Sequence, residues 1–428
     1  MVLGWFRRCS LRERFVILSK ARDLGLAHTT LVGRCRQAPR SLVLLEMTPR
    51  FGSRYTGDPR VLPVKMYWGA RAFAGDYVKR NISAMKKLAG FFFPVLCAVF
   101  LLAVDQSKIP PMPIAVSDNA VVALRGGLDV YSLMGMGTKR TWDDVTNKVY
   151  ILHISSAKWS EGRAVPGVGG RLGASAVGVK GQIFLFGGYL LDGQGGELTV
   201  PDVNAYLPEG KRWYRAEDIP VAVDRAVIGV NHDRYIYLVG GRSKNGPINN
   251  VQVYDVEKNT WSQATPFPGP PVFGHAGGLT DDAIVYVDGA KKNTAAGAPY
   301  VASDECWIGK IDHKDPDKIV WNKLPAHPGM ARFGTVSGEK DRRVFFSGGS
   351  SSPHNFKGMG DDGKPVELSG LTFDYDVKAN RWETISEDTF DVRSDTRGIV
   401  NTPIGQMIIG GLVKNTAASA RAMILPKR

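Results

Sequence analysis

Short apolar runs that end in two glycines recur along the chain. Residues 235–241 read YIYLVGG, an alternation of aromatic and β-branched residues typical of a strand, followed by the residue type that is poorest at forming one. The same arrangement occurs in residues 183–188, 344–349 and 407–411. Each run predicts a buried strand that stops at a sharp turn, and the recurrence predicts a repeat architecture.

The glycine pairs are regularly spaced. With Met134 and Asp288 accepted as degenerate first members, the pairs begin at residues 134, 187, 240, 288, 348 and 410, at intervals of 53, 53, 48, 60 and 62. A tryptophan follows each of the first five pairs, at Trp159, Trp213, Trp261, Trp321 and Trp382. One four-stranded sheet per repeat of about 50 residues is typical of the kelch β-propeller. We therefore expect an all-β, six-bladed kelch propeller over residues 105–428, with the glycines and tryptophans in structural roles.

The sixth repeat is incomplete. Arg428 follows Gly411 too soon for an outer strand, and no tryptophan follows this last pair. Residues 108–116, KIPPMPIAV, resemble the stretches that follow the tryptophans, such as AEDIPV and ATPFPG. We expect this segment to supply the missing strand of the last blade and to close the ring, which would leave no open sheet edge between the first and last blades.

Charge separates the first 84 residues from the rest. The chain has 55 Lys+Arg and 41 Asp+Glu; residues 1–84 hold 16 and 5 of these, a surplus of 11, which leaves a surplus of 3 for the remainder. A nearly neutral body without a basic stripe argues against a nucleic-acid partner. We interpret residues 1–84 as an upstream extension of low order.

Met85 begins a stretch with the layout of a secretory signal. Two lysines follow it, and then an uncharged apolar run over residues 88–104. We expect residues 85–104 to be a signal peptide and the mature protein to be periplasmic or secreted. A transmembrane helix over residues 88–104 is the alternative, at the short limit for spanning a bilayer, and an uncleaved segment would be the expected membrane contact.

The sequence contains no clear motif for a disulfide, a metal or another cofactor. After signal cleavage Cys306 is the remaining cysteine of four, so no intrachain disulfide is expected. The histidines are scattered, and the sequence lacks HExxH, paired CxxC, G-x-S-x-G and a well-spaced dinucleotide fingerprint. We expect neither a metal nor another cofactor.

The starts of the innermost strands supply candidate ligand residues. Counted back from the glycine pairs, these positions are Asn119, Arg171, Arg225, His275, Arg332 and Arg393 or Arg397. Because six blades converge on one axis, we expect these side chains to ring the channel mouth, where guanidiniums match the geometry of a carboxylate. The predicted substrate-binding arginines are Arg171, Arg225, Arg332 and Arg397. Internal pairing, for example of Arg225 with Asp224, is the alternative.

Two further residues are candidates for proton transfer. His275 interrupts the arginines, and an ordinary histidine titrates near neutrality, so we predict a catalytic role; a channel residue bonded to water is the alternative. The insertion at residues 350–370 lengthens the fifth repeat. We expect it to fold over the mouth, where His354 would join the ligand site and Glu367 would act as acid or base. A solvated surface loop is the alternative for this insertion.

From about Asp105 to Arg428 the sequence resembles the bacterial N-acetylneuraminate epimerase (sialic acid mutarotase) group of exported six-bladed kelch proteins. The likeness lies in the stretches IPPMPIAV, WNKLPAHP, FKG and GQMIIGG. The resemblance implies arginines that bind the carboxylate of a sugar and a glutamate that transfers protons from a long insertion in the third blade. Here the corresponding link, GGRSKNGPINNVQVYD, is short.

The partner expected from this resemblance is a small anionic sugar or glycan. If the protein is an enzyme, the expected reaction is interconversion of sugar anomers, with arginines on the carboxylate and His275 or Glu367 moving protons. A non-catalytic propeller that binds a protein or glycan through the same face is the alternative.

Overall fold

The computed structural model describes residues 109–167, 169–387 and 392–426, together with four strands nearer the N-terminus. The chain divides into two compact units, residues 1–98 and 99–428. In the first unit, one antiparallel sheet contains, in order, β1 (Val16–Lys20), β2 (His28–Arg34), β3 (Leu42–Arg50) and β4 (Tyr67–Phe73). The predicted signal peptide, residues 85–104, lies outside the described residues. Within the described part, no helix has the length and apolarity to cross a bilayer.

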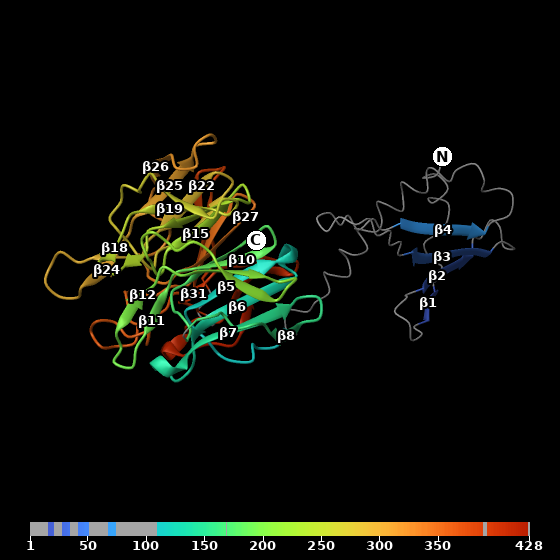
Figure 1. The fold of residues 1–428 in the computed structure, drawn as a ribbon, viewed down its shortest axis with the longest axis horizontal. Coiled ribbons are helices and arrows are strands. Elements are labelled where there is room, and N and C mark those ends of the chain that lie inside the picture. Colours follow the sequence, from blue (N-terminus) through green and yellow to red (C-terminus); the bar gives the residue numbers. More distant parts are fainter. Residues whose placement is uncertain are drawn as a thin grey trace. The chain divides into compact units, whose positions relative to one another are not determined.

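The second unit is a six-bladed β-propeller, as predicted, and its sheets are visible in Figure 1. Each blade is an antiparallel sheet whose strands run in chain order from the axis outwards. The strands of blades 1 to 3 are β5 (Asn119–Leu124), β6 (Asp129–Met136), β7 (Val145–His153), β8 (Lys158–Glu161); β9 (Ser175–Val179), β10 (Gln182–Phe186), β13 (Val203–Leu207), β14 (Arg212–Arg215); and β15 (Val227–Asn231), β16 (Tyr235–Val239), β19 (Val251–Asp255), β20 (Thr260–Ala264).

Blades 4 and 5 repeat this order, and blade 6 has three strands of its own. Their strands are β21 (Ala276–Thr280), β22 (Ala283–Val287), β25 (Cys306–Ile311), β26 (Ile319–Lys323); β27 (Val336–Lys340), β28 (Arg343–Ser347), β29 (Leu371–Asp376), β30 (Arg381–Glu387); and β32 (Val400–Thr402), β33 (Gly405–Ile409), β34 (Ala422–Ile424). In addition, β31 (Thr396–Arg397) pairs in parallel with β5, which joins the last blade to the first.

Two faces of the ring carry different connections. Turns between the first and second strands lie on one face, here called the hairpin face. Links between the second and third strands lie on the other, the loop face, together with the starts of the innermost strands. Three links form small hairpins: β11 (Tyr189–Leu191) with β12 (Glu197–Thr199), β17 (Arg242–Ser243) with β18 (Gly246–Pro247), and β23 (Ala290–Lys292) with β24 (Tyr300–Ala302).

The glycine pairs turn the chain sharply where blades meet. Gly240 and Gly241 have φ values of 63° and 101°, in the left-handed region that glycine adopts without strain. The amide of Gly241 donates to the carbonyl oxygen of Val272 in the segment that enters the next blade, at 3.0 Å. A Cβ atom at Gly348 would collide with the carbonyl oxygen of Arg393. The structural role predicted for the pairs is confirmed.

The five repeat tryptophans share one contact. The indole Nε1–H donates to a main-chain carbonyl in the segment that follows the outer strand of the preceding blade. The pairs are Trp159 to Pro110, Trp213 to Arg163, Trp261 to Glu217, Trp321 to Thr265 and Trp382 to Pro325. Pro110 therefore stands where the segments between consecutive blades stand, so the indoles tie each blade to its neighbour.

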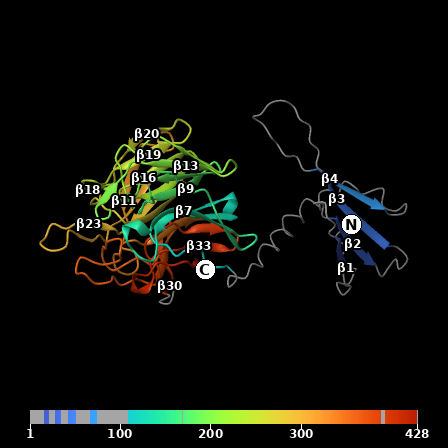
Figure 2. The same cartoon turned by 60° about the horizontal axis from the view of Figure 1, so that its bottom comes forward.

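The N-terminal segment closes the ring. Its Met112 and Val116 amides donate to the carbonyl oxygens of Ala420 and Ser419, at 2.7 and 3.0 Å, in the segment that leads into β34. The Gly411 amide donates to the carbonyl of Val116, at 2.9 Å, as the Gly241 amide does to that of Val272 in the next blade. In Figure 2, β33 lies beside blade 1, and its Met407 and Ile409 belong to one buried cluster with Val121 and Val130 of blade 1. The N-terminal segment thus contacts the last blade, but residues 109–116 form no strand and the described sheet of blade 6 has three, so the predicted fourth strand is not observed there; Lys108 lies outside the described residues.

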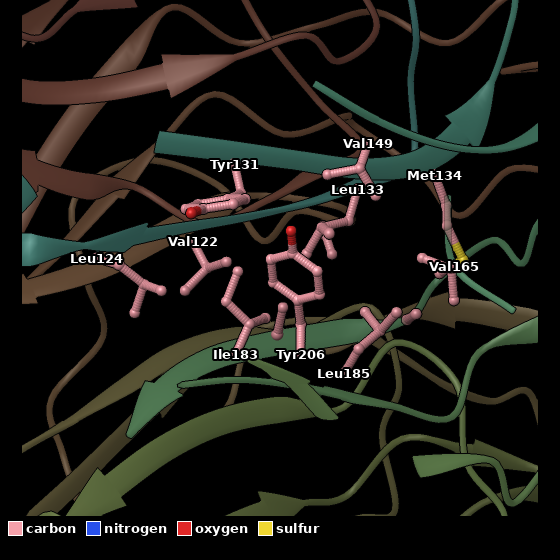
Figure 3. Close-up of a cluster of buried hydrophobic side chains, with 13 residues drawn as sticks. Val122, Leu124, Tyr131, Leu133, Met134, Val149, Val165, Ile183, Leu185 and Tyr206 are labelled. Atoms are coloured by element: carbon pink, nitrogen blue, oxygen red, sulfur yellow. The ribbon is translucent and has the colours of Figure 1, made fainter. Parts of the chain in front are cut away.

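The core is divided among the interfaces between blades. Figure 3 shows Tyr131, Leu133 and Val149 of blade 1 pointing toward Ile183 and Tyr206 of blade 2. All of these side chains are buried. Because each blade packs on both neighbours, burial of apolar area stabilises the ring only when all six blades are in place.

Candidate functional site

A channel runs along the propeller axis between the innermost strands. Its cavity of about 710 Å³ is lined mostly by backbone and small side chains of β5, β9, β15 and β27, and by residues 395–403. It reaches the hairpin face beside Arg125 and Lys180, whose side chains are 68% and 41% exposed. At the loop face it ends against a ring of backbone.

This ring, here called the collar, contains one residue from each blade. All six adopt a left-handed backbone: Asp118, Gly173, Arg225, Gly274, Gly334 and Asp395. Main-chain hydrogen bonds of 2.5 to 3.1 Å run from collar residue to collar residue, each amide donating to the carbonyl of the preceding blade, at five of the six junctions. The collar therefore closes the loop-face end of the channel with backbone.

Three arginines stand two residues before the collar and clamp their own blades. Arg171 donates to Oδ1 of Asn204 at 2.7 Å, Arg332 to the carbonyl of Gly348 at 3.2 Å, and Arg393 to the carbonyl of Gly410 at 2.8 Å. All three are buried. The channel lining does not include them. We call Arg171, Arg332 and Arg393 the clamp arginines.

The sequence analysis expected one equivalent side chain from each blade around the channel mouth. The residues that it chose do not occupy equivalent positions. Arg171 and Arg332 precede the collar, Arg225 lies in it, His275 follows it by one residue and Arg397 by two. Counting back from the glycine pairs treated these positions as equivalent. They are not, because the number of residues between the collar and the glycine pair differs from blade to blade. Of the four predicted arginines, the structure brings together Arg225 and Arg397.

Charged side chains gather around the collar. Four arginines, Arg140, Arg225, Arg242 and Arg397, face four carboxylates, Asp118, Asp224, Asp395 and Glu197, through direct contacts or through-space attraction. We call this set the axial charge cluster. Its formal charges cancel.

The two terminal nitrogens of Arg225 are paired within this cluster, while its Nε has no hydrogen-bond partner among the described residues. Its guanidinium contacts Asp118 and Asp224, each at 3.1 Å, and donates to the Tyr189 hydroxyl at 3.0 Å. Burial alone would lower its pKa, but Tyr189, Asp118 and Asp224 together raise the pKa of Arg225 well above its ordinary value. Arg225 thus pairs internally, including with its neighbour Asp224, as the alternative interpretation anticipated.

Arg397 differs from Arg225 in its environment. It lines the channel, and its Nε lies 3.8 Å from Oδ1 of Asp118, which is too long for a hydrogen bond. Nε is buried without a hydrogen-bond partner among the described residues. Burial lowers the pKa of Arg397 and outweighs the attraction of Asp118. The structure therefore leaves a weakly compensated cation at the inner end of a cavity.

His275 packs between blades 3 and 4. Its ring lies against Gly240 and forms an edge contact with Tyr286, with centroids 5.5 Å apart. Burial, together with the charge of Arg397, lowers the pKa of His275 to about 3. The side chain is therefore neutral at pH 7, and the expectation that it titrates near neutrality is wrong because that expectation assumed a solvated ring.

The insertion at residues 350–370 places its two candidates differently. The His354 side chain is 1% exposed, and its Nε2 lies 3.4 Å from Oδ2 of Asp395 in the collar. Glu367 is exposed, and its main-chain carbonyl accepts a hydrogen bond from Ser351. Within the described chain, His354 joins the axial charge cluster, whereas no side-chain contact connects Glu367 with it.

Sequence reasoning missed three carboxylates. Asp118 and Asp395 occupy the same collar position in their blades, a signal that an alignment on the collar would have revealed. Glu339 lines the channel and keeps contact with its solvent, while the surrounding protein walls desolvate its carboxyl and raise its pKa to about 7. The candidate site thus has more acidic groups than the sequence analysis assigned to it.

Among the described residues, no group of three or more His, Cys, Asp or Glu side chains is placed to hold a metal ion. Burial raises the pKa of the Cys306 thiol to about 12, so this cysteine is protonated at neutral pH.

Comparison with known proteins gives the family. Residues 120–349, more than half of the chain, match the family described as "KLHDC2/KLHL20/DRC7 Kelch-repeats domain". The chain belongs to this kelch-repeat family.

Individual relatives of this kelch propeller are distant. Kelch-like protein 15 of Gallus gallus is 26% identical over 171 residues, which cover 40% of this chain and 34% of that protein. The chain thus spans about a third of that relative's length. N-acetylneuraminate epimerase of Haemophilus influenzae (strain PittEE) is 22% identical over 344 residues, covering 68% of this chain and 85% of the relative.

Among solved structures, that of a protein named YjhT resembles this one with a TM-score of 0.59 and 19% identity. The match covers 74% of this chain and 96% of the other. This likeness shows the fold.

Proposed function

We propose that this kelch propeller binds a small acidic sugar at the inner end of its channel, where Arg397 holds the carboxylate. The observation that carries the proposal is the weakly compensated guanidinium of Arg397 beside a cavity of about 710 Å³. A buried charge without a close partner is unfavourable by several kcal/mol. A carboxylate offers two oxygens in the geometry that a guanidinium matches, so a bound acid would remove this penalty.

The class of acid is suggested by the relatives. One of them is named N-acetylneuraminate epimerase, and it is aligned over 85% of its length. N-acetylneuraminate carries a carboxylate beside several hydroxyl groups, which suits a site in which Arg397 stands close to Asp118 and Asp395. This likeness supports the ligand class and does not by itself establish it.

For anomer interconversion, a group must move protons between the ring oxygen and the anomeric hydroxyl. His275 is neutral and packed between blades, and Glu367 is exposed outside the channel. Glu339 lines the same channel, but it stands five residues beyond the collar, toward the hairpin face, whereas the carboxylate of N-acetylneuraminate is bonded to the anomeric carbon itself. Mutarotation is the activity to test, and its proton carrier must lie beside Arg397.

The experiment measures binding of N-acetylneuraminate by calorimetry and anomer exchange by NMR saturation transfer. Arg397→Ala should weaken binding roughly ten- to a hundredfold, since a charge-assisted pair is worth about 1.5 to 3 kcal/mol. Arg332→Ala is the matched control: it removes a buried arginine of a neighbouring blade and should leave affinity unchanged. Glu339→Gln, toward the hairpin-face end of the channel, should change neither affinity nor exchange.

Three results bear against the proposal. Wild-type protein that binds no acidic sugar would remove the function altogether. An Arg397→Ala variant with wild-type affinity would place the carboxylate elsewhere. Equal binding of the neutral sugar N-acetylmannosamine would show that the carboxylate is not what the protein recognises.

Export belongs to the same proposal. The signal layout of residues 85–104 predicts that the mature chain begins after this segment and lies in the periplasm or outside the cell. Intact-mass and N-terminal analysis of the exported protein tests it. A mature form that begins upstream of Met85 contradicts this assignment.

One observation favours a second candidate, a protein or glycan partner on the loop face. Trp142 and Leu198 are 54% and 61% exposed there. Gly193, in the turn that joins β11 to β12, lies close enough to the Trp142 ring that a Cβ would contact it. Loss of partner capture on Trp142→Ala, with sugar binding intact, would favour this candidate.

A further inference from the structure

The insertion at residues 350–370 crosses from blade 5 to three other blades. Arg140 of blade 1 donates hydrogen bonds to the main-chain carbonyls of Phe356, in the insertion, and Thr416, in blade 6. The Phe356 side chain packs against a buried cluster that contains Met136 of blade 1 and Tyr189 of blade 2. The insertion therefore covers the loop face of the collar.

Buried polar atoms that make no hydrogen bond among the described residues lie near this cover. They are Oδ1 of Asp118 and of Asp395, Nε of Arg140 and of Arg225, and Nε2 of His354, which has an ion-pair contact with Asp395 at 3.4 Å. Asp118, Arg225 and Asp395 are at most 5% exposed. A buried polar atom without a hydrogen bond is destabilising, so a group of five is an unfavourable arrangement for a site with no ligand.

The insertion is held mainly by local bonds and a few contacts across the ring. Within it, the Ser351 amide donates to Glu367 at 2.9 Å and the Asn355 amide to Met359 at 3.1 Å. Its contacts beyond blade 5 include those of Phe356, Gly358 against Thr416, and His354 with Asp395. A segment with its own turns and few external contacts can open without disturbing the blades.

We propose that residues 350–370 form a lid over a second ligand site, on the loop face of the collar, and that this site takes a neutral polyhydroxylated molecule such as a hexose or polyol. Hydroxyl groups can donate to Asp118 and Asp395 and accept from Arg140 and Arg225. The charges of the axial charge cluster already cancel, so a neutral ligand leaves no charge uncompensated. In the closed form, His354 occupies the position of a ligand hydroxyl beside Asp395.

This site goes beyond the proposed function and does not depend on it. The two sites share Asp118, whose Oδ1 lies 3.8 Å from Nε of Arg397. The charge of the probe distinguishes them: an acidic sugar reports on Arg397, and a neutral one reports on the space beneath the lid.

The test removes the lid. Because the Ser351 amide faces the Glu367 carbonyl, residues 352–366 can be replaced by Asn-Gly, a pair that forms a tight two-residue turn. The matched control replaces residues 294–298, in the blade 4 link, by the same pair, since the Asn293 amide donates to Pro299 at 2.9 Å. Both variants shorten a loop-face link, but only the replacement of residues 352–366 should open the site.

The first readout is chemical modification of arginine by phenylglyoxal, located by peptide mass spectrometry. Lid removal should raise the rates at Arg140 and Arg225 at least several-fold, while the control should match the wild type. Unchanged rates at these arginines in a folded lid variant overturn the proposal, because the insertion then covers nothing.

The second readout is binding of D-galactose and mannitol, followed by calorimetry. The lid variant should bind one of them more tightly than the wild type does, because no closed state competes with the ligand. Its affinity for N-acetylneuraminate should equal that of the wild type. A folded lid variant that binds neither neutral probe, or that gains affinity for N-acetylneuraminate instead, contradicts the neutral-ligand site.

Phe356→Ala keeps the test decisive if the deletion does not fold. Losing the apolar contact should raise modification at Arg140 in the same direction, while Lys357→Ala, at the next position, should not. Equal modification in these two variants counts against the lid.

Discussion

The clamp arginines and two arginines of the axial charge cluster, Arg225 and Arg397, come from the same short segment at the start of an innermost strand, yet the two sets have different surroundings. Arg171 and Arg332 donate to groups within their own blades, whereas Arg397, four residues further along its blade than Arg393, lines the channel 3.8 Å from its nearest carboxylate. A shift of two to four residues thus separates a structural arginine from a candidate ligand residue. Residue type alone does not distinguish them.

Opening the propeller ring should abolish both the structural role of the clamp arginines and ligand binding by Arg397. This is the largest effect that we expect. Deletion of residues 109–116 removes the carbonyl to which Trp159 donates, together with the backbone bonds of the N-terminal segment to Ser419, Ala420 and Gly411. Cooperative unfolding should be lost, because Met112 and Val116 belong to the buried cluster between blades 6 and 1. Thermal unfolding followed by circular dichroism is the measurement. A variant that melts like the parent shows that the segment does not close the propeller.

A clamp arginine should affect stability and leave ligand binding unchanged. Arg171→Ala leaves Oδ1 of buried Asn204 without its 2.7 Å donor. The free energy of unfolding should fall by about 2 to 4 kcal/mol, from the unpaired group and the lost packing. Urea denaturation measures it, with exposed Arg212→Ala as the control. A stable Arg171→Ala variant with weakened sugar binding would reverse the assignment of the two sets.

Acid should destabilise the folded protein, because His275 is buried in its neutral form. The unfolded chain takes up a proton at this histidine below about pH 6.5, but the folded protein does so near pH 3, so stability falls as the pH drops between these values. From pH 7 to pH 5 the loss should be about 2 kcal/mol for this group. His275→Asn introduces the residue that blade 1 has at the same position, Asn119, and should remove that part of the pH dependence.

Urea midpoints at the two pH values measure the effect. The exposed histidine His313, replaced by Asn, serves as the control. A His275→Asn variant with the pH dependence of the wild type shows that His275 is solvated, and it would return this residue to the list of proton carriers.

The smallest effect tests the equivalence of the segments between blades. Trp159→Phe keeps the ring and removes the 2.8 Å bond to Pro110, so it should lower stability by about 1 kcal/mol. Trp142→Phe, at an exposed position, should have no effect. Equal midpoints for the two variants in urea would mean that the indole bond to the closing segment contributes nothing.

The fold could be predicted because its signals are local and repeated. Each apolar run, glycine pair and tryptophan indicates the same four-stranded blade. The missing sixth tryptophan pointed to the segment that closes the ring. The collar carries no such signal, because Asp118, Arg225 and Asp395 adopt there a left-handed backbone that glycine adopts in the other three blades. Which residue faces the axis is set by contacts between blades.

The same reason limits the prediction of the candidate site. The pKa of His275 follows from its burial against Gly240 and Tyr286, which lie 35 and 11 residues away in sequence. The path of the insertion depends on the packing of the Phe356 side chain against blades 1 and 2. The sequence indicated that His354 and Glu367 share one loop, but only the packing separates the covered side chain from the exposed one.

The most direct test of the difference between the two sets is to observe the arginine Nε–Hε groups by NMR during titration with N-acetylneuraminate. Our account predicts a saturable shift of the Arg397 signal, a smaller one for Arg225 through Asp118, and none for Arg171 or Arg332. Assignment comes from single Arg→Lys variants. Shifts at the clamp arginines, or a titration in which Arg397 does not respond, would contradict the central claim.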